Sequence, residues 1–152
     1  MSTLRQWCRK NPGAKNALDN LFRGTIYSFD NPRNFENLER IYSVCEKAWN
    51  RNLRRLRGQR IRYLLIAEAA PWTDPLKPPS YFYENLAGNW CKRITRVFGI
   101  ENNNHEVALN ELANRGFVLV DSLPFAAPYT SQLRNKHPYL EIIRACRPYF
   151  AD

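Results

Sequence analysis

The sequence lacks the residue clusters of a metal centre. It contains two histidines and four cysteines, and the cysteines (Cys8, Cys45, Cys91 and Cys146) are widely spaced and form no C-x-x-C pair. Zinc sites need closely grouped Cys and His ligands, so we expect no metal ion and no cofactor. Each cysteine lies in a helical pattern beside apolar residues, which predicts buried free thiols.

Long hydrophobic runs are also missing. No segment approaches the roughly 18 apolar residues that mark a membrane span, and the first ten residues, MSTLRQWCRK, lack the apolar segment of a signal peptide. There is no internal repeat, low-complexity run or glycine-rich phosphate loop. We therefore expect a cytoplasmic protein with no membrane contact. The length suits one domain over 1–152, with helices over 1–61 and a sheet core over 62–152.

Acidic residues are few relative to basic ones. The chain has 23 Lys and Arg against 14 Asp and Glu, a net charge of +9. Such an excess favours a polyanionic partner, and nucleic acid is favoured over a membrane because no basic amphipathic anchor stands out. Guanidinium groups match phosphate in a bidentate manner, and six arginines occur between Lys47 and Glu68 with no acid among them. Contacts with the nucleic-acid backbone are expected from Arg54, Arg55, Arg57 and Arg60. The alternative is a solvated helix face.

Two apolar runs predict the strands of the fold. YLLIA at 63–67 ends at Glu68, and FVLV at 117–120 ends at Asp121. Continuous apolar runs of this length suit strands that are buried on both faces of a parallel sheet. The helical patterns between them predict a parallel crossover and an α/β fold. If the strands are neighbours, Glu68 and Asp121 share a crevice in which paired acids can divide acid and base work.

Apolar residues at steps of three and four predict the helices around these strands. Residues 3–22 are expected to form one or two short helices, separated at Pro12 and Gly13, and a long helix runs from about Asn34 to about Gly58. Further helices are expected over 86–98, after Asn103 or Asn104, and from Pro138. The proline-rich stretch 71–80 predicts a stiff loop outside the sheet. At least one of the three aromatics at 81–83 should face a cleft or solvent, since alternate residues of an extended segment cannot all face inward.

Four segments, taken in order, resemble the uracil-DNA glycosylase superfamily. They are LLIAEAAP, PPSYFYENLAGNWCKRITRVFGI, GFVLVDSLPFAAPYT and EIIRACRPYF. The first resembles a signature of the iron–sulfur branch, and the mismatch-specific branch is similar in motif order. The resemblance covers 62–152 and implies a three-layer α/β/α fold with a short parallel sheet. It also implies a DNA glycosylase of base-excision repair, which binds DNA, flips a base and hydrolyses its N-glycosidic bond.

The resemblance assigns roles to individual residues. Glu68 matches the water-positioning residue and Asp121 the residue that reads the base edge. Phe82 matches the aromatic that stacks on the flipped base, with Tyr83 in that role if the register shifts by one. An aromatic platform recovers part of the unstacking cost, and a carboxylate can orient water and stabilise an oxocarbenium-like cation. Two more residues are expected in the base pocket: Ala69 and Pro71.

The chain departs from the family pattern in several places. Ala67 and Pro71 replace signature glycines, and Asp121 stands where Asn is common. An ionised Asp only accepts hydrogen bonds, so it suits guanine or protonated cytosine better than uracil. Of the cluster-binding cysteines Cys146 alone has a counterpart, so we expect no iron–sulfur cluster.

The family's His-Pro-Ser signature does not follow the final helical pattern. We therefore expect a truncated or short form, or a partner that supplies the missing half. An incomplete sheet exposes an unpaired edge, which a homo-oligomer or another protein can cover. Two other functions stay open at this point: a non-catalytic nucleic-acid-binding module of the same fold, and an assembly subunit whose basic face meets an acidic protein.

Overall fold

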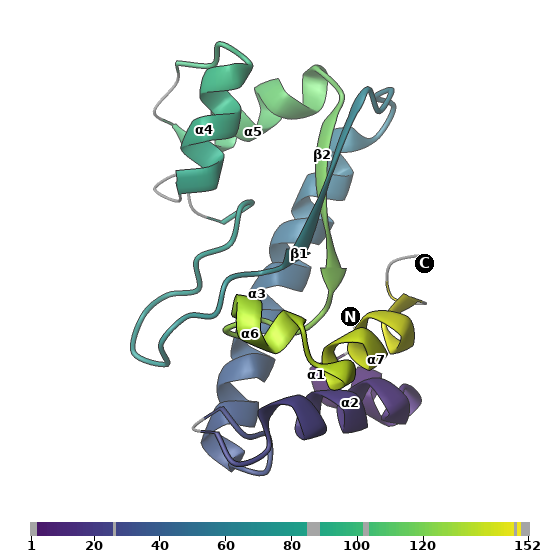
Figure 1. Cartoon of the computed structure of the whole chain (residues 1–152). Coiled ribbons are helices and arrows are strands. Elements are labelled where there is room, and N and C mark those ends of the chain that lie inside the picture. The colour runs from purple at the N-terminus through teal and green to yellow at the C-terminus, as the bar shows by residue number, and fades with distance from the viewer. Residues whose placement is uncertain (1–2, 26, 85–88, 102–103, 148, 150–152) are drawn as a thin grey trace.

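The protein is an α/β structure with one parallel two-stranded sheet (Figure 1). The computed structural model describes residues 3–25, 27–84, 89–101, 104–147 and 149. The α/β class predicted from the two apolar runs is confirmed. In chain order the elements are α1 (Leu4–Lys10), α2 (Pro12–Phe22), α3 (Pro32–Leu56), β1 (Tyr63–Ala69), α4 (Asn89–Val97), α5 (His105–Asn114), β2 (Phe117–Leu123), α6 (Ser131–Arg134) and α7 (His137–Ala145).

Local sequence explains where most helices begin. Thr3 and Gln6 form a capping box at α1, and α2, α3 and α7 each have proline in the first turn, where its missing N–H has no cost. The side chain of Asn104 caps α5 by accepting from the Val107 N–H at 3.2 Å. Asn104 is therefore the cap expected at this helix, while Asn103 lies outside the described residues.

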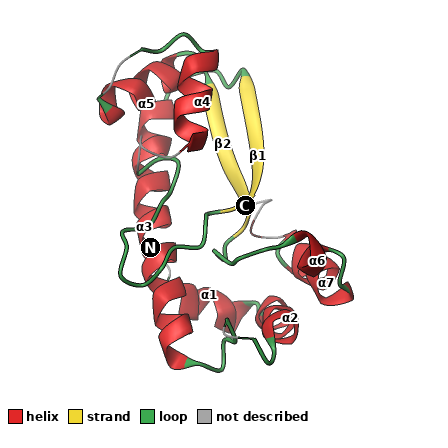
Figure 2. Ribbon diagram, turned by 60° about the vertical axis from the view of Figure 1, so that its left-hand side comes forward, coloured by secondary structure: helices red, strands yellow, loops and turns green. Residues whose placement is uncertain are grey.

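The two strands are parallel, as predicted, and they are direct neighbours. They pair in parallel over a continuous stretch that begins with Tyr63 opposite Phe117 and ends with Ala67 opposite Asp121. A further pair is formed by Ala69 and Leu123. Helix α3 runs alongside the sheet, with α4 and α5 near one end and α1, α2, α6 and α7 near the other (Figure 2). Since β1 and β2 run in the same direction, their carboxyl ends lie together on the side of α6 and α7.

The buried apolar residues form two clusters, one at each end of α3. The first joins α1, α2, the amino-terminal half of α3, the segment after β2, and α7. The second joins the other half of α3 with residues 81–83, α4, α5 and β2. Of the cysteines, Cys8, Cys91 and Cys146 are buried, Cys45 is half-buried, and all four are free thiols. Among the described helices, none combines the length and apolarity needed to cross a bilayer.

The proline-rich segment 71–80 forms no strand, as predicted, and α3 holds it in place. Asn37 Nδ2 donates to the Thr73 carbonyl at 3.0 Å. The Arg40 guanidinium donates to the carbonyls of Asp74 and Lys77 at 3.2 and 3.0 Å. These bonds fix the loop as one wall beside the carboxyl end of β1.

The expectation that β1 is buried on both faces is wrong. Tyr63, Leu64 and Ile66 are 53%, 57% and 55% exposed, whereas Phe117 and Leu119 of β2 are 4% and 5% exposed. The described helices cover β2. Among the described residues the sheet has two strands, and β1 lies at its exposed edge. Apolar residues are buried only where a second surface meets them.

The helical apolar stripes also continue beyond the core. Trp90 and Val97 of α4 are 62% and 79% exposed, and Leu53 of α3 is 45% exposed. The 3.6-residue period identifies these helices correctly, but it does not show how wide a face each one buries.

Gly116 fixes where β2 begins, and we expect Gly116→Ala to lower the free energy of unfolding by about 3 kcal/mol or more. Its φ is +75°, and an added Cβ would lie 2.2 Å from the Arg60 carbonyl oxygen. Gly58 is the matched control, because its φ is +78° but no atom lies within 4 Å of such a Cβ. Gly58→Ala should cost about 1 kcal/mol, from backbone strain alone. Urea denaturation measures the free energy of unfolding of both variants. Equal decreases would show that the close backbone contact at Gly116 does not contribute to the cost.

Candidate functional site

A cavity of about 500 Å³ lies at the carboxyl end of the sheet. Its walls come from β1, the segment that follows it, residues 80–82, the first turn of α4, β2 and α6. A volume of this size accommodates a small organic ligand or a single base. The lining residues are Leu65, Ile66, Ala67, Glu68, Ala69, Ala70, Pro71, Ser80, Tyr81, Phe82, Trp90, Cys91, Leu119, Asp121 and Arg134.

The cavity brings together five of the six catalytic and base-binding residues predicted from the sequence. Glu68 and Asp121 both line it, which confirms that the two strand ends share a crevice. Three predicted base-binding residues line it with them: Phe82, Ala69 and Pro71. The register of the sheet places the two acids near each other along the strands, since Ala67 is paired with Asp121 and Glu68 is the next residue along β1, although consecutive side chains of a strand point to opposite faces of the sheet.

Tyr83 lies in the core and not in the lining of the cavity. The residue is 2% exposed, and its hydroxyl accepts from the Leu119 N–H at 2.7 Å and donates to the Leu119 carbonyl at 2.9 Å. Phe82 packs edge-on against Tyr83, with ring centroids 4.9 Å apart. Of the three consecutive aromatics, Tyr81 and Phe82 therefore face the cavity and Tyr83 braces β2.

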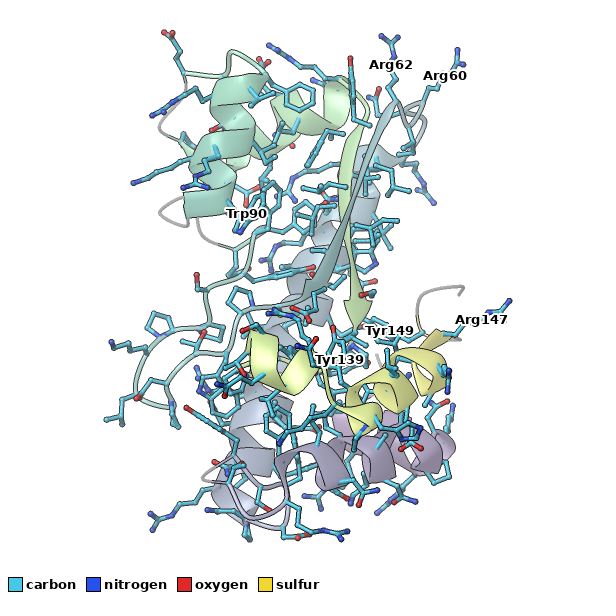
Figure 3. The ribbon with its side chains drawn as sticks, viewed as in Figure 1. Arg60, Arg62, Trp90, Tyr139, Arg147 and Tyr149 are labelled. Carbon is cyan, nitrogen blue, oxygen red and sulfur yellow. The ribbon has the colours of Figure 1, made fainter. Side chains whose placement is uncertain are left out.

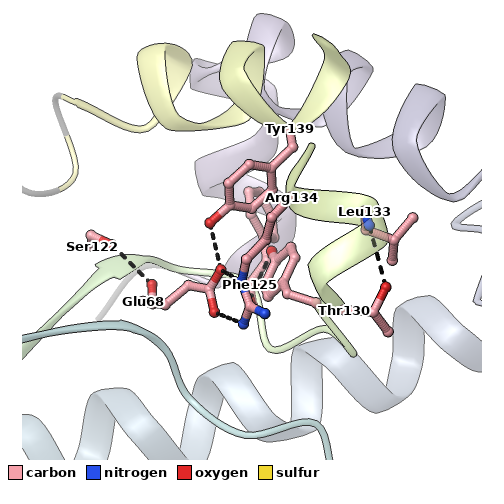
Figure 4. Close-up of polar contacts among 8 residues, drawn as sticks. Glu68, Ser122, Phe125, Thr130, Leu133, Arg134 and Tyr139 are labelled. Atoms are coloured by element: carbon pink, nitrogen blue, oxygen red, sulfur yellow. Dashed lines mark hydrogen bonds and ion pairs between the residues drawn. The ribbon is translucent and has the colours of Figure 1, made fainter. Parts of the chain in front are cut away.

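Glu68 is held by side chains from α6 and α7 (Figure 4). Arg134 donates from Nε to Oε1 at 2.8 Å and from Nη2 to Oε2 at 2.5 Å, and the Tyr139 hydroxyl donates to Oε1. The Ser122 hydroxyl donates to the backbone carbonyl of Glu68 at 3.0 Å. A carboxylate has about four acceptor positions, so these contacts fill three of them and leave one on Oε2.

These contacts keep Glu68 ionised. The hydrogen bonds from Arg134 lower the pKa of the Glu68 carboxyl, partial burial acts in the opposite direction, and the Tyr139 hydroxyl lowers the pKa further. Stabilising the charged form in this way suits a group that must be a carboxylate at neutral pH.

Asp121 has the opposite environment. Burial raises the pKa of its carboxyl from 3.8 to about 6, and a hydrogen bond with the Tyr81 side chain offsets part of the rise. Within the described residues no ion pair reaches Asp121. The two acids of the cavity therefore differ in charge under mildly acidic conditions, with Glu68 ionised and Asp121 largely neutral.

The predicted backbone-contact arginines lie away from this cavity. Arg54, Arg57 and Arg60 are exposed, and Figure 3 shows Arg60 and its neighbour Arg62 at the end of β1 opposite to Tyr139. A seven-residue strand separates the two ends by about 20 Å. Arg55 differs from the others: it pairs with Glu106 of α5, and its side chain is 10% exposed. The pair joins α3 to α5, so Arg55 offers little to an external phosphate.

Several residues of the site were not identified as site residues from the sequence. Those with aromatic or charged side chains are Tyr81, Trp90, Arg134 and Tyr139. Arg134 belongs to a short helix whose start, capped by Thr130, has a clear local signal. Its contact with Glu68 spans 66 positions of the chain, so nothing near Arg134 in the sequence marks it. Trp90 falls within the apolar period of its helix, a pattern that predicts burial, but it is exposed beside the cavity.

Comparison of the chain with protein-family models, with curated proteins and with solved structures finds no match. In the described part of the chain, no group of three His, Cys, Asp or Glu side chains is placed to hold a metal ion. The site presents two carboxylates in different environments, a guanidinium and several aromatic rings.

We expect Tyr83→Phe to reduce the free energy of unfolding by about 1–3 kcal/mol, because it leaves both backbone groups of Leu119 without a partner inside the core. The exposed Tyr63 is the control, and Tyr63→Phe should change stability by less than about 0.5 kcal/mol. Chemical denaturation of both variants checks this. A stable Tyr83→Phe protein with a weakened ligand affinity would instead assign the hydroxyl to the site.

Proposed function

We propose that this protein is a DNA glycosylase of the uracil-DNA glycosylase type, with the three-layer α/β/α arrangement of that superfamily. It binds DNA, accepts an extruded base in the cavity and hydrolyses the N-glycosidic bond. The observation that carries the proposal is the convergence of Glu68, Asp121 and Phe82 on one cavity. The strand-end pattern suggested Glu68 and Asp121, the resemblance suggested Phe82, and the three residues are up to 53 positions apart in the sequence.

The cavity has the properties that an extruded base requires. Phe82 and Trp90 offer aromatic surface, which recovers stacking energy lost from the duplex. Asp121 stands at the end of β2 to meet the hydrogen-bonding edge of the base. When neutral, its carboxyl both donates and accepts, so it complements the adjacent acceptor and donor of uracil. When ionised it only accepts, and it then suits an edge with neighbouring donors.

Glu68 supplies the charge for bond cleavage. Its remaining acceptor position on Oε2 holds a water, and its negative charge stabilises the oxocarbenium-like sugar. Arg134 and Tyr139 orient the carboxylate and prevent its protonation. In this division of roles, Glu68 orients the water and stabilises the cationic sugar, and Asp121 binds the base.

Cations near the cavity contact the DNA flanking the extruded base. Lys92 and Arg93 are exposed on α4, two and three residues after Trp90. The exposed arginines Arg54, Arg57 and Arg60 meet the phosphate backbone farther along the duplex, about six base pairs away at 3.4 Å per pair.

The central test is base release from oligonucleotides carrying uracil, mismatches or modified cytosines. Uracil release should increase as the pH falls from 7 to 5 and then level off, because the neutral form of Asp121, with its pKa of about 6, pairs with uracil. Asp121→Asn mimics the neutral acid, so it should release uracil about tenfold faster than the wild type at pH 7 and lose this pH dependence.

Glu68→Gln is the matched variant for catalysis. It keeps the shape of the side chain but removes the charge, so DNA binding should persist while base release is lost. Absence of product from the wild-type chain on every substrate, with binding intact, would reject the glycosylase proposal.

A second candidate function is a non-catalytic nucleic-acid-binding module. The hydrogen bonds that Glu68 already makes favour this function, since Arg134 and Tyr139 satisfy its carboxylate much as a structural ion pair would. In that case the cavity holds a base or nucleotide without cleaving it, and affinity depends on phosphate contacts.

Salt dependence on duplexes of two lengths locates those contacts. Lys92→Ala combined with Arg93→Ala should reduce the slope of log affinity against log salt by about 2 on any duplex. Arg54→Ala combined with Arg57→Ala should have this effect on a duplex of about 20 base pairs centred on the modified base, but not on one of about 8, which is too short to reach them. Fluorescence anisotropy measures both slopes. Equal effects of the Arg54 and Arg57 pair on both lengths would place these arginines next to the extruded base.

A further inference from the structure

An apolar surface extends along the outer edge of β1 and onto α4. We call it the β1–α4 surface and define it by Tyr63, Leu64, Ile66, Trp90 and Val97, which are each more than half exposed. Two hollows lie along it. One is the site cavity, and the other is an open depression of about 690 Å³ toward the opposite end of β1.

The edge of β1 also carries free hydrogen-bonding capacity. The Tyr63 N–H donates to the Gly116 carbonyl at 3.1 Å, so this amide faces β2. Amides alternate in direction along a strand, which turns those of Leu64 and Ile66 outward. No described strand pairs with this edge. An unpaired apolar edge is a template for another strand.

We propose that a second copy of this chain covers the β1–α4 surface, with the two β1 strands antiparallel and a two-fold axis at Leu65. The sequence of the strand is self-complementary about that position. Leu64 then opposes Ile66 of the second copy, and Arg62 opposes Glu68 of the second copy, with each pairing occurring twice.

Neighbouring registers fit less well. Outward amides must face one another, so the register can shift only by an even number of residues. With the axis moved to Leu64, Arg62 opposes the apolar Ile66. With the axis moved to Ile66, Leu64 opposes the charged Glu68. The register centred on Leu65 alone among these matches apolar with apolar and positive with negative.

The dimer adds a residue to the candidate site. The pairing forms a four-stranded sheet, and it brings Arg62 of the second copy beside Glu68 at the rim of the cavity. The net charge of +9 on each copy opposes association. Moderate salt screens that long-range repulsion more than it weakens the close contacts, so the dimer becomes tighter as salt is raised.

Sedimentation velocity of the 152-residue chain over a range of concentrations tests the surface. The wild type should form a dimer, and Leu64→Lys with Ile66→Lys should weaken it at least about tenfold. Leu76→Lys with Leu140→Lys is the matched control, because it adds the same charge at two exposed leucines elsewhere, 95% and 49% exposed. Circular dichroism establishes that each variant is folded.

A cysteine placed on the axis tests the register without depending on the lysine variants. Leu65→Cys should form a disulfide-linked dimer on mild oxidation, because directly opposed Cβ atoms lie about 5 Å apart. Tyr63→Cys should not, because it lies about 13 Å from its own copy. The wild type, with its four native cysteines, controls for other crosslinks. A monomer at all concentrations, a dimer insensitive to the lysine pair, or equal crosslinking of both cysteine variants would overturn the proposal.

Discussion

The parallel pairing of β1 with β2 is the constraint on which the candidate site depends. Gly116 sets one end of the register, because its lack of a side chain lets β2 begin against the backbone of Arg60. Ser122 acts at the other end through its hydrogen bond to the Glu68 carbonyl. A slip of one residue would reverse the face of every side chain of one strand relative to the other and would change which side chains line the cavity. The positions of the site residues therefore depend on the register of the sheet.

The two acids acquire different properties from the elements that follow their strands. Glu68 receives Arg134 and Tyr139 from α6 and α7, so a cation accompanies it at the strand end. Asp121 receives Tyr81 and little else that is polar, so burial dominates its pKa. Two carboxyl groups with separate protonation behaviour in one cavity are the usual basis for divided acid–base roles. Here the separation comes from α6 and α7 on one side and from the aromatic segment on the other.

The local features of this structure can be predicted from the sequence, but few of its long-range contacts can. Caps, prolines and apolar periods mark the helices, and the two acids at strand ends mark the crevice, because each of these signals lies within a few residues of its effect. The exposure of Leu64 depends on whether another surface meets β1, and no local pattern records that. Likewise Arg55 lies in a basic run that suggests phosphate binding, but its place on α3 turns it toward Glu106 of α5. The charge pattern of a sequence shows how many arginines a segment has, but it does not show which of them form ion pairs within the protein.

The open edge of β1 and the cavity cannot act independently, because they share Ile66 and Glu68. A strand laid against Ile66 closes one wall of the cavity and places a cation near Glu68. A ligand in the cavity contacts the same stretch of β1 and so changes how well it pairs with that strand. Such coupling is reciprocal: if covering the edge tightens ligand binding, then ligand binding tightens the cover by the same factor. In the proposed dimer, the exposed β1 strand is thus also the element through which assembly and the site influence each other.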